Sequence, residues 1–163
     1  MRNDKKITFL IFIIFLTFIN IVVFSGVNTN VSRITVTQAI VNKYINTLPG
    51  YAKKSKEIGQ RYSVEGSATQ SDAVQSNNIL NNYLKSSGWA NPRDFYAVNI
   101  KICVAYGWVG IIASEIPEAQ KQQALAQFDP VLDSYGITAS EKAVIKNNAK
   151  RLKALFEQIS EDN

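Results

Sequence analysis

The chain has 163 residues, of which 18 are Lys or Arg and 13 are Asp or Glu, and it contains one Cys and no His. A single Cys cannot form an internal disulfide, and the lack of His removes the most common metal ligand and general base, so we expect no metal site and no cofactor. The basic residues form no stripe with interleaved aromatic residues, and we therefore expect no nucleic-acid partner.

The N-terminal segment has the pattern of an export signal. Arg2, Lys5 and Lys6 precede an apolar run from Ile7 to Phe24, which is interrupted only by Thr8, Thr17 and Asn20. This is the order of a positive flank and a hydrophobic segment. The run of 18 residues lies at the lower limit for a helix that crosses a bilayer and above the usual length of a cleaved signal. The membrane is therefore the expected partner of this segment, and the rest of the chain is expected to be exported.

Cleavage of the signal and its retention as a single-pass anchor both remain open. Val23 and Ser25 occupy the small-residue positions that a signal peptidase would read before Gly26. Three of the 18 basic residues and one of the 13 acidic residues precede Gly26, so the remaining part has a net charge of only +3. We expect residues 1–26 to be a signal peptide or membrane anchor, residues 27–34 a linker, and residues 35–163 one domain, periplasmic or anchored at the inner membrane.

The first predicted helix of the domain runs from Thr35 to Leu48. Thr35 and Gln38 have the spacing of a capping box, in which two orphan backbone N–H groups at the helix start are satisfied by side chains. The apolar residues at helical intervals after them are Ile40, Val41, Tyr44, Ile45 and Leu48. Pro49 and Gly50 predict the end of this helix, and a shorter, Lys-rich helix is expected over 51–62.

Residues 63–70 are small and polar and predict a loop. Ser71 and Asp72 are typical of a helix start, and Gly88 is typical of a helix end. The predicted apolar face of this helix carries Val74, Leu80, Tyr83 and Leu84.

The strongest local signal stands at the start of the helix predicted over 92–113. Asn91 is a capping residue, Pro92 fits the first helical position, and Asp94 lies in the first turn, where a negative charge is stabilised. Its apolar positions occur on nearly every side: Phe95, Val98, Ile100, Ile102, Val104, Tyr106, Trp108, Val109, Ile111 and Ile112. Such a helix is expected at the centre of a domain.

Two further helices are predicted after this one. The first begins at Pro117, is broken or kinked at Pro130, and ends at Gly136. The second begins with a capping box formed by Thr138 and Glu141 and continues to about Ile159. Since no segment alternates with period two, the fold class is all-α, with five or six helices around the 92–113 helix.

Cys103 and a run of small residues lie within the same central helix. With no His to activate it, Cys103 is interpreted as a small core residue rather than a reactive thiol. Gly107, Gly110 and Ala113 lie three apart on one face. This spacing favours close packing inside the domain over a membrane-type helix contact.

Five residues are candidates for a partner surface. Trp89 stands in an interhelical corner, where it either presents an exposed aromatic ring or closes the end of the core. Lys53, Lys54, Lys56 and Arg61 form a basic cluster that either contacts anionic headgroups or belongs to a solvated helix face.

No catalytic motif stands out, and we expect the chain not to be an enzyme. Hydrolysis by paired carboxylates needs two acids in one cleft. The acidic residues at helix starts and predicted surfaces are Asp94, Glu115, Glu118, Asp129, Asp133, Glu141 and Glu157. A hydrolase is therefore the least favoured alternative.

Two resemblances bear on function. The segment Ile34 to Gln38 (I-T-V-T-Q) is similar to the L-T-x-x-Q motif of small helical periplasmic chaperones of the stress-response type, and Ile137 to Glu141 (I-T-A-S-E) is a looser second copy. That resemblance implies a holdase role. The order of helices around Leu84 to Tyr96 (L-K-S-S-G-W-A-N-P-R-D-F-Y) resembles, in pattern, a group of small exported helical bacterial proteins of unknown function.

Together these features predict a non-enzymatic, exported or membrane-tethered helical interaction domain that binds another protein of the cell envelope. The alternative is a periplasmic chaperone of the stress-response type.

Overall fold

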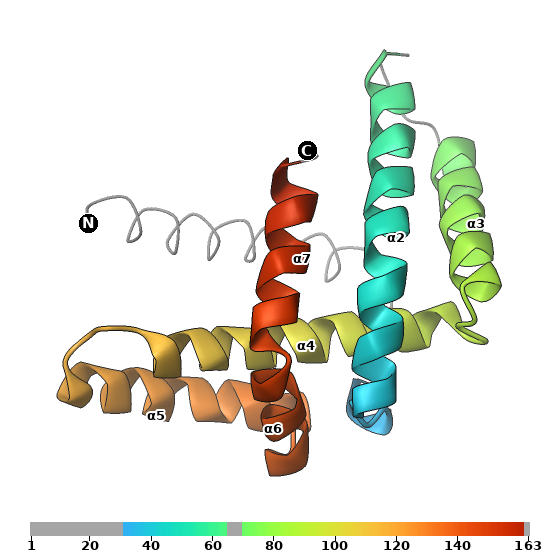
Figure 1. Cartoon of the computed structure of the whole chain (residues 1–163). Helices are drawn as coiled ribbons and strands as arrows, with labels where there is room; N and C mark the ends of the chain where they lie inside the picture. The colour runs from blue at the N-terminus through green and yellow to red at the C-terminus, as the bar shows by residue number, and fades with distance from the viewer. Residues whose placement is uncertain (1–30, 65–69, 162–163) are drawn as a thin grey trace.

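The computed structural model describes residues 31–64 and 70–161 (Figure 1). Over these residues the chain forms only helices: η1 (Val31–Arg33), α2 (Gln38–Val64), α3 (Gln70–Ser86), α4 (Pro92–Ala113), α5 (Glu118–Ser134), α6 (Ala139–Asn147) and α7 (Ala149–Glu161). The all-α prediction is therefore confirmed for the described part of the chain. The predicted signal or anchor segment, the start of the predicted linker and residues 65–69 of the predicted loop lie outside the described residues.

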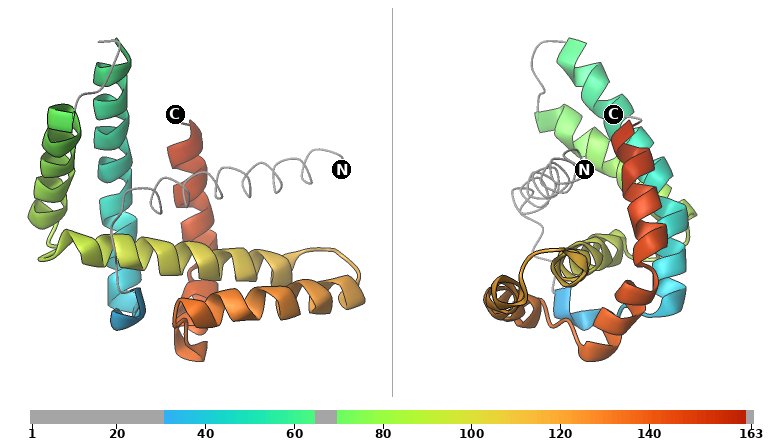
Figure 2. Two further views of the ribbon diagram at one scale, coloured as in Figure 1. Left: turned by 180° about the vertical axis from the view of Figure 1, so that it is seen from behind. Right: turned by 60° about the vertical axis from the view of Figure 1, so that its left-hand side comes forward.

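The helix α4 is the element against which most of the others pack. It contacts η1, α2, α3, α5 and α6, and its Val98, Ile102 and Ala105 have no exposed surface. Figure 2 shows α5 running back alongside α4, while α2, α3 and α7 extend away from α4 on the same side. Because α4 has neighbours on several sides, apolar residues around most of its circumference are buried.

The bounds of α4 agree with the prediction. The side chain of Asn91 accepts a hydrogen bond from the backbone N–H of Arg93 at 3.1 Å, and Pro92 occupies the first turn. At the other end, the backbone N–H of Ser114 donates to the carbonyl of Ile111 at 3.2 Å. Local capping chemistry was sufficient to place the start of this helix, and the end of its apolar run placed the other end.

The helix α2 passes through Pro49, so the predicted helix end at Leu48 is wrong. A proline inside a helix removes one backbone hydrogen bond, but packing offsets that cost here. Leu48 is buried, and the Tyr83 hydroxyl of α3 donates to the carbonyl of Thr47 at 3.0 Å. A side chain at Gly50 would overlap the Tyr83 hydroxyl, so glycine permits the close approach of α3.

The predicted capping box of Thr35 and Gln38 is also wrong. The helix begins at Gln38, and the side chain of Thr37 accepts a hydrogen bond from the N–H of Ile40 at 3.3 Å. The chain before it is held differently, because the backbone N–H of Val36 donates to Glu141 at 2.8 Å. Thr37 therefore caps α2 locally, and the long-range bond to Glu141 holds the chain that precedes the helix.

The later turns contain the predicted glycines. Gly88 and Gly136 have φ values of +88° and +61°, which glycine adopts without strain. The capping box of Thr138 and Glu141 is formed as predicted. Pro130 lies inside α5, which continues to Ser134, so the predicted break at that proline is not a helix end.

The last predicted helix is divided in two at Asn148. The side chain of Asn148 is buried, donates to the carbonyl of Val144 at 2.9 Å, and exchanges two hydrogen bonds with the Gln38 amide of α2. The backbone N–H of Asn148 still donates to the carbonyls of Val144 and Ile145 at 3.2 and 3.1 Å, so the division is a local distortion of the helix at this residue. The result is a change of direction between α6 and α7, which places α7 beside α2.

Candidate functional site

A buried ion pair connects α4 with α6. The ammonium group of Lys101 lies 2.9 Å from Oε1 of Glu141, and the two side chains are 2% and 1% exposed. From the sequence, Glu141 was predicted only as a capping residue, and Lys101 was not among the candidates. A lysine in the middle of an apolar helix was the available signal, because a buried ammonium group requires a partner.

Both oxygens of the Glu141 carboxylate accept hydrogen bonds from two donor groups each. Oε1 also accepts the backbone N–H of Val36 at 2.8 Å, and Oε2 accepts the N–H and the hydroxyl of Thr138 at 2.8 and 2.9 Å. Burial alone would raise the pKa of Glu141, but the hydrogen bonds from Thr138, Val36 and Lys101 hold that pKa below its usual value. Lys101 also donates to the carbonyl of Gly136 at 3.1 Å. This arrangement joins the segment before α2, which we call the chain entry (residues 31–37), to α4 and α6. Because its oxygens already accept these hydrogen bonds, the carboxylate has little capacity to bind a substrate.

Cys103 lies in the core, as predicted. Its sulfur is 3.7 Å from Oδ1 of Asn99, which also accepts a hydrogen bond from the Tyr44 hydroxyl at 2.6 Å. Burial raises the pKa of the Cys103 thiol to about 12. A protonated, enclosed thiol is a poor nucleophile.

The interpretation of Trp89 as an exposed partner residue is wrong. Trp89 is 2% exposed, and its indole N–H donates to the hydroxyl of Thr47 at 3.0 Å. Its ring packs edge-on against Phe95, and the Lys43 ammonium lies 4.5 Å from the ring centroid. Trp89 therefore closes the end of the core between α2 and α4, which was the alternative interpretation.

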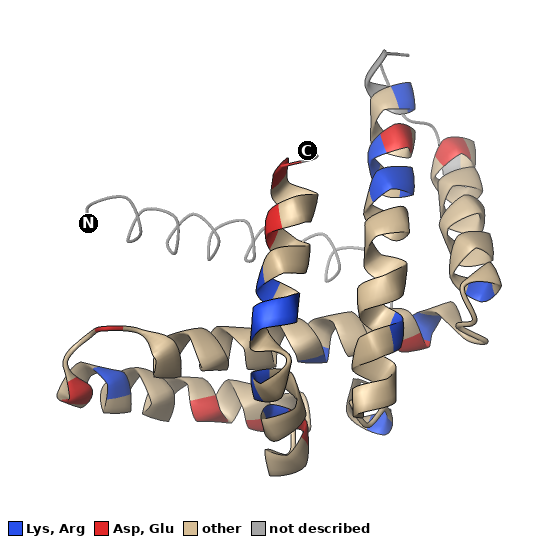
Figure 3. Cartoon of the chain, in the orientation of Figure 1, with Lys and Arg blue, Asp and Glu red and all other residues tan. Residues whose placement is uncertain are grey.

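The four basic candidates lie together on the second half of α2 (Figure 3). Lys53 and Arg61 are exposed, and the Lys54 ammonium lies 5.7 Å from the centroid of the Tyr83 ring. At 1.5 Å per residue, Lys53 stands about 23 Å and Arg61 about 35 Å along the axis from Gln38. Because α2 is continuous, this cluster is distant from the chain entry although it is near in sequence.

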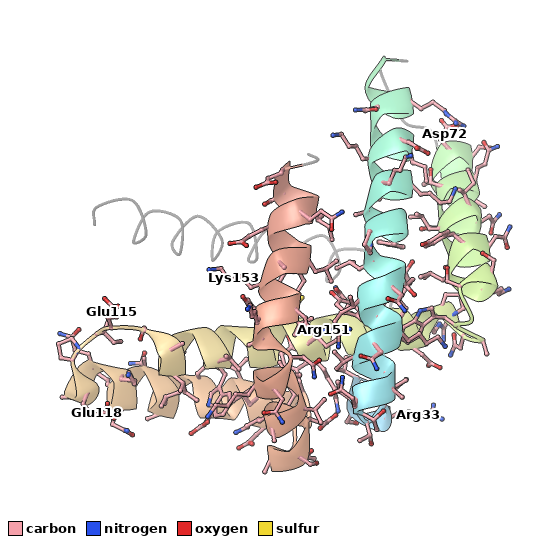
Figure 4. All side chains as sticks on the ribbon, in the orientation of Figure 1. Arg33, Asp72, Glu115, Glu118, Arg151 and Lys153 are labelled. Atoms are coloured by element: carbon pink, nitrogen blue, oxygen red, sulfur yellow. The ribbon has the colours of Figure 1, made fainter. Side chains whose placement is uncertain are left out.

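A groove beside this cluster separates α2 from α7. It has a volume of about 480 Å³ and is lined by Pro49, Gly50, Ala52, Lys53, Lys56, Gln158 and Ile159. The two helices are joined near their starts by the bonds between Gln38 and Asn148, and Nη1 of Arg151 donates to the side chain of Asn42 at 2.8 Å. Figure 4 shows Arg151 extending from α7 toward α2 and Lys153 extending away from it. The groove therefore lies farther along the two helices than these hydrogen bonds, which hold α2 and α7 together near their starts.

The small residues of α4 do not share one role. An added Cβ at Gly107 would lie 3.3 Å from Phe128 of α5, whereas an added Cβ at Gly110 would meet nothing within 4 Å. Gly107 therefore serves packing inside the fold.

Within the described ranges, α4 is also the one helix with the length and composition of a membrane span, and half of its most apolar window is buried in the protein.

Over residues 31–64 and 70–161 no group of three or more Cys, Asp or Glu side chains is placed to hold a metal ion. Glu115 and Glu118 lie where α4 ends and α5 begins, at the end of these helices away from α6, which contains Glu141 (Figure 4). Comparison with protein-family models, curated proteins and solved structures finds no match to this chain. The groove between α2 and α7, with its two lysines, is the candidate site that the geometry favours.

Proposed function

We propose that this chain is an exported or membrane-tethered helical interaction domain of the cell envelope, without enzymatic activity, which binds another envelope protein at the α2–α7 groove. The observation that carries the proposal is the apolar run from Ile7 to Phe24 behind Arg2, Lys5 and Lys6. Such a run directs the downstream part of a chain to or across a membrane.

The attachment of the chain entry supports tethering. Val31 and Ile34 pack against the core, and Val36 is bonded to Glu141. Six residues, 25–30, separate Phe24 from Val31, and at full extension they span about 20 Å. A retained anchor would therefore hold the domain within a short distance of the bilayer.

The state of the reactive side chains supports an interaction role over catalysis. Cys103 is buried with a raised pKa, and Glu141 is bonded to Lys101, Val36 and Thr138. These groups stabilise the fold. The groove, in contrast, has exposed charge beside apolar surface, which is a combination found at protein-binding sites.

The test of export is the intact mass of the native protein after separation of membrane, soluble-envelope and cytosolic fractions. A full-length mass in the membrane would support a tethered domain, and a mass that begins near Gly26 in the soluble envelope would support a released one. Recovery of the full-length protein in the cytosol would overturn the proposal. A variant with Ile14→Arg and Leu16→Arg, which interrupts the apolar run, is the matched control and should remain in the cytosol.

A chaperone of the stress-response type is the second candidate. It rests on the resemblance of Ile34 to Gln38 and Ile137 to Glu141 to the chaperone motif, and of the two capping boxes predicted in these segments only that of Thr138 and Glu141 is formed. The full-length protein in mild detergent would be mixed with an unrelated unfolding protein. Suppression of aggregation at stoichiometric ratios would favour this candidate, and no suppression would exclude it.

A further inference from the structure

We infer that the α2–α7 groove binds an acidic segment of the partner that carries apolar residues on one side. This inference rests on the proposed function and specifies the chemistry of its partner. It is drawn from three features of the groove: its small and apolar lining, its cationic edge and its fixed end.

The lining leaves room for apolar side chains of a ligand. On the α2 side, Pro49, Gly50 and Ala52 present little side-chain bulk. Ile159 of α7 lies opposite and is only partly buried by the core. A volume of about 480 Å³ falls in the range of sites that take several ligand side chains. Apolar groups that enter the groove would cover surface that the described part of the chain leaves in water.

The edge of the groove is positively charged. Lys53 and Lys56 line it, and none of the described lining residues is acidic. From Tyr51 to Arg61 the helix carries four basic residues and one acidic residue, Glu57. The facing helix α7 carries two acids, Glu157 and Glu161, and neither lines the groove; a carboxylate oxygen of Glu157 lies 3.8 Å from the Lys153 ammonium on the same helix. Charge complementarity therefore favours carboxylates on the ligand.

The groove is preformed. Hydrogen bonds of Gln38 with Asn148 and of Asn42 with Arg151 fix the crossing of α2 and α7 at one end. A site that is held open by its own fold loses less free energy on binding than one that must be ordered. A single helix or extended strand is the kind of segment that binds in a groove of this type.

A peptide segment fits these features better than a lipid surface. Headgroups would complement the positive charge of this edge but would leave the apolar lining without a counterpart. In addition, Lys53 stands about 23 Å along the α2 axis from Gln38, so the groove lies away from the chain entry. Both features favour a partner protein over the membrane.

The test uses the full-length chain in nanodiscs of phosphatidylcholine. Two synthetic peptides share their length and the leucine positions of an amphipathic helix, and they differ only in having Glu or Lys at the flanking positions. The probe is the change in the NMR signals of Ala52 and Ile159 during titration. We expect the Glu peptide to shift both signals and the Lys peptide to shift neither. Equal shifts with both peptides, or no shift with either, would overturn the inference.

Charge reversal on the groove gives the matched comparison. The variant with Lys53→Glu and Lys56→Glu should bind the Glu peptide at least about tenfold more weakly than the unchanged protein, because two positive side chains that attract the peptide carboxylates become negative ones that repel them. The control reverses Lys146 and Lys150, two exposed lysines outside the groove, and should bind like the unchanged protein. Equal weakening in both variants would overturn the inference. Ala52→Phe fills the lining without a change of charge, should also weaken binding, and keeps the test decisive if the reversal variant unfolds.

The membrane alternative is tested in nanodiscs that contain phosphatidylglycerol. If the basic cluster lay on lipid, the signals of Lys53 and Lys56 would shift without peptide, and the Glu peptide would no longer bind. That result would overturn the inference, and unchanged peptide binding would support it. These measurements do not depend on export. The binding experiments can therefore fail while the fractionation experiment supports export, and the binding experiments can succeed while the fractionation experiment fails.

Discussion

Lys101 and Glu141 are 40 positions apart in the chain, and their charged groups meet at 2.9 Å in the interior of the domain. The carboxylate also accepts hydrogen bonds from Val36, before α2, and from Thr138, before α6. One side chain thus joins three segments that are distant in sequence. Because both charges are enclosed, the pair is a sensitive point of the fold.

Glu141→Gln should destabilise the protein by about 3–5 kcal/mol, because it leaves the Lys101 ammonium buried without a counter-charge. Gln retains the ability to complete a capping box, so the loss reports mainly on the ion pair. The measurement is urea unfolding of the full-length chain in mild detergent. Adding Lys101→Met to Glu141→Gln should recover part of the loss, and a further loss in the double variant would contradict this role of the pair.

Acid should weaken the protein through the same carboxylate. The pKa of Glu141 is held below its usual value of 4.5, so its contribution to stability is complete above that pH and is lost as the pH falls through the folded-state pKa. Urea midpoints should therefore fall more for the unchanged protein than for Glu141→Gln between neutral pH and about pH 3. Parallel curves for the two proteins would show that Glu141 does not carry the effect.

Two glycines of α4 should respond differently to alanine. Gly110→Ala adds a methyl group to open space on a helix and should stabilise the protein by about 0.5–1 kcal/mol. Gly107→Ala places its methyl group 3.3 Å from Phe128, so the gain in helix propensity should be cancelled by the displaced ring. Thermal unfolding of both variants measures the difference, and equal melting temperatures would be evidence against this packing.

The Cys103 thiol should be almost unreactive in the folded protein. Its pKa is raised to about 12 and its side chain is enclosed, so little thiolate forms at neutral pH. Labelling with a thiol reagent in buffer and in urea measures the contrast. We expect labelling to occur only on unfolding, and rapid labelling of the native protein would require an exposed Cys103.

Ile102→Asp should prevent folding, because Ile102 has no exposed surface and the substitution buries an unpaired charge. Circular dichroism and thermal unfolding of the variant test this placement of the core. A soluble variant with a cooperative transition would contradict it. Val131→Asp is the matched control, since Val131 is 39% exposed and the same charge should be tolerated there.

Local signals were sufficient for the parts of the fold that depend on neighbours in sequence. The bounds of α4 are set by Asn91, Pro92 and its apolar residues, and the start of α6 is set by Thr138 and Glu141. Capping is a contact between residues two or three positions apart, so the sequence contains all of it. The all-α class and the burial of Ile102 were likewise determined by periodicity alone.

The tertiary structure decided the features that depend on distant residues. It carries α2 through Pro49, where α3 supplies the Tyr83 contact, and it divides α6 from α7 at Asn148, which bonds to Gln38. It also encloses Trp89, pairs Lys101 with Glu141, and places Lys53 and Lys56 beside Ile159 in one groove. None of these contacts is announced by a regular spacing of residues in the sequence. Their stability comes from burial and hydrogen bonds between segments far apart in the chain, which a local pattern does not encode.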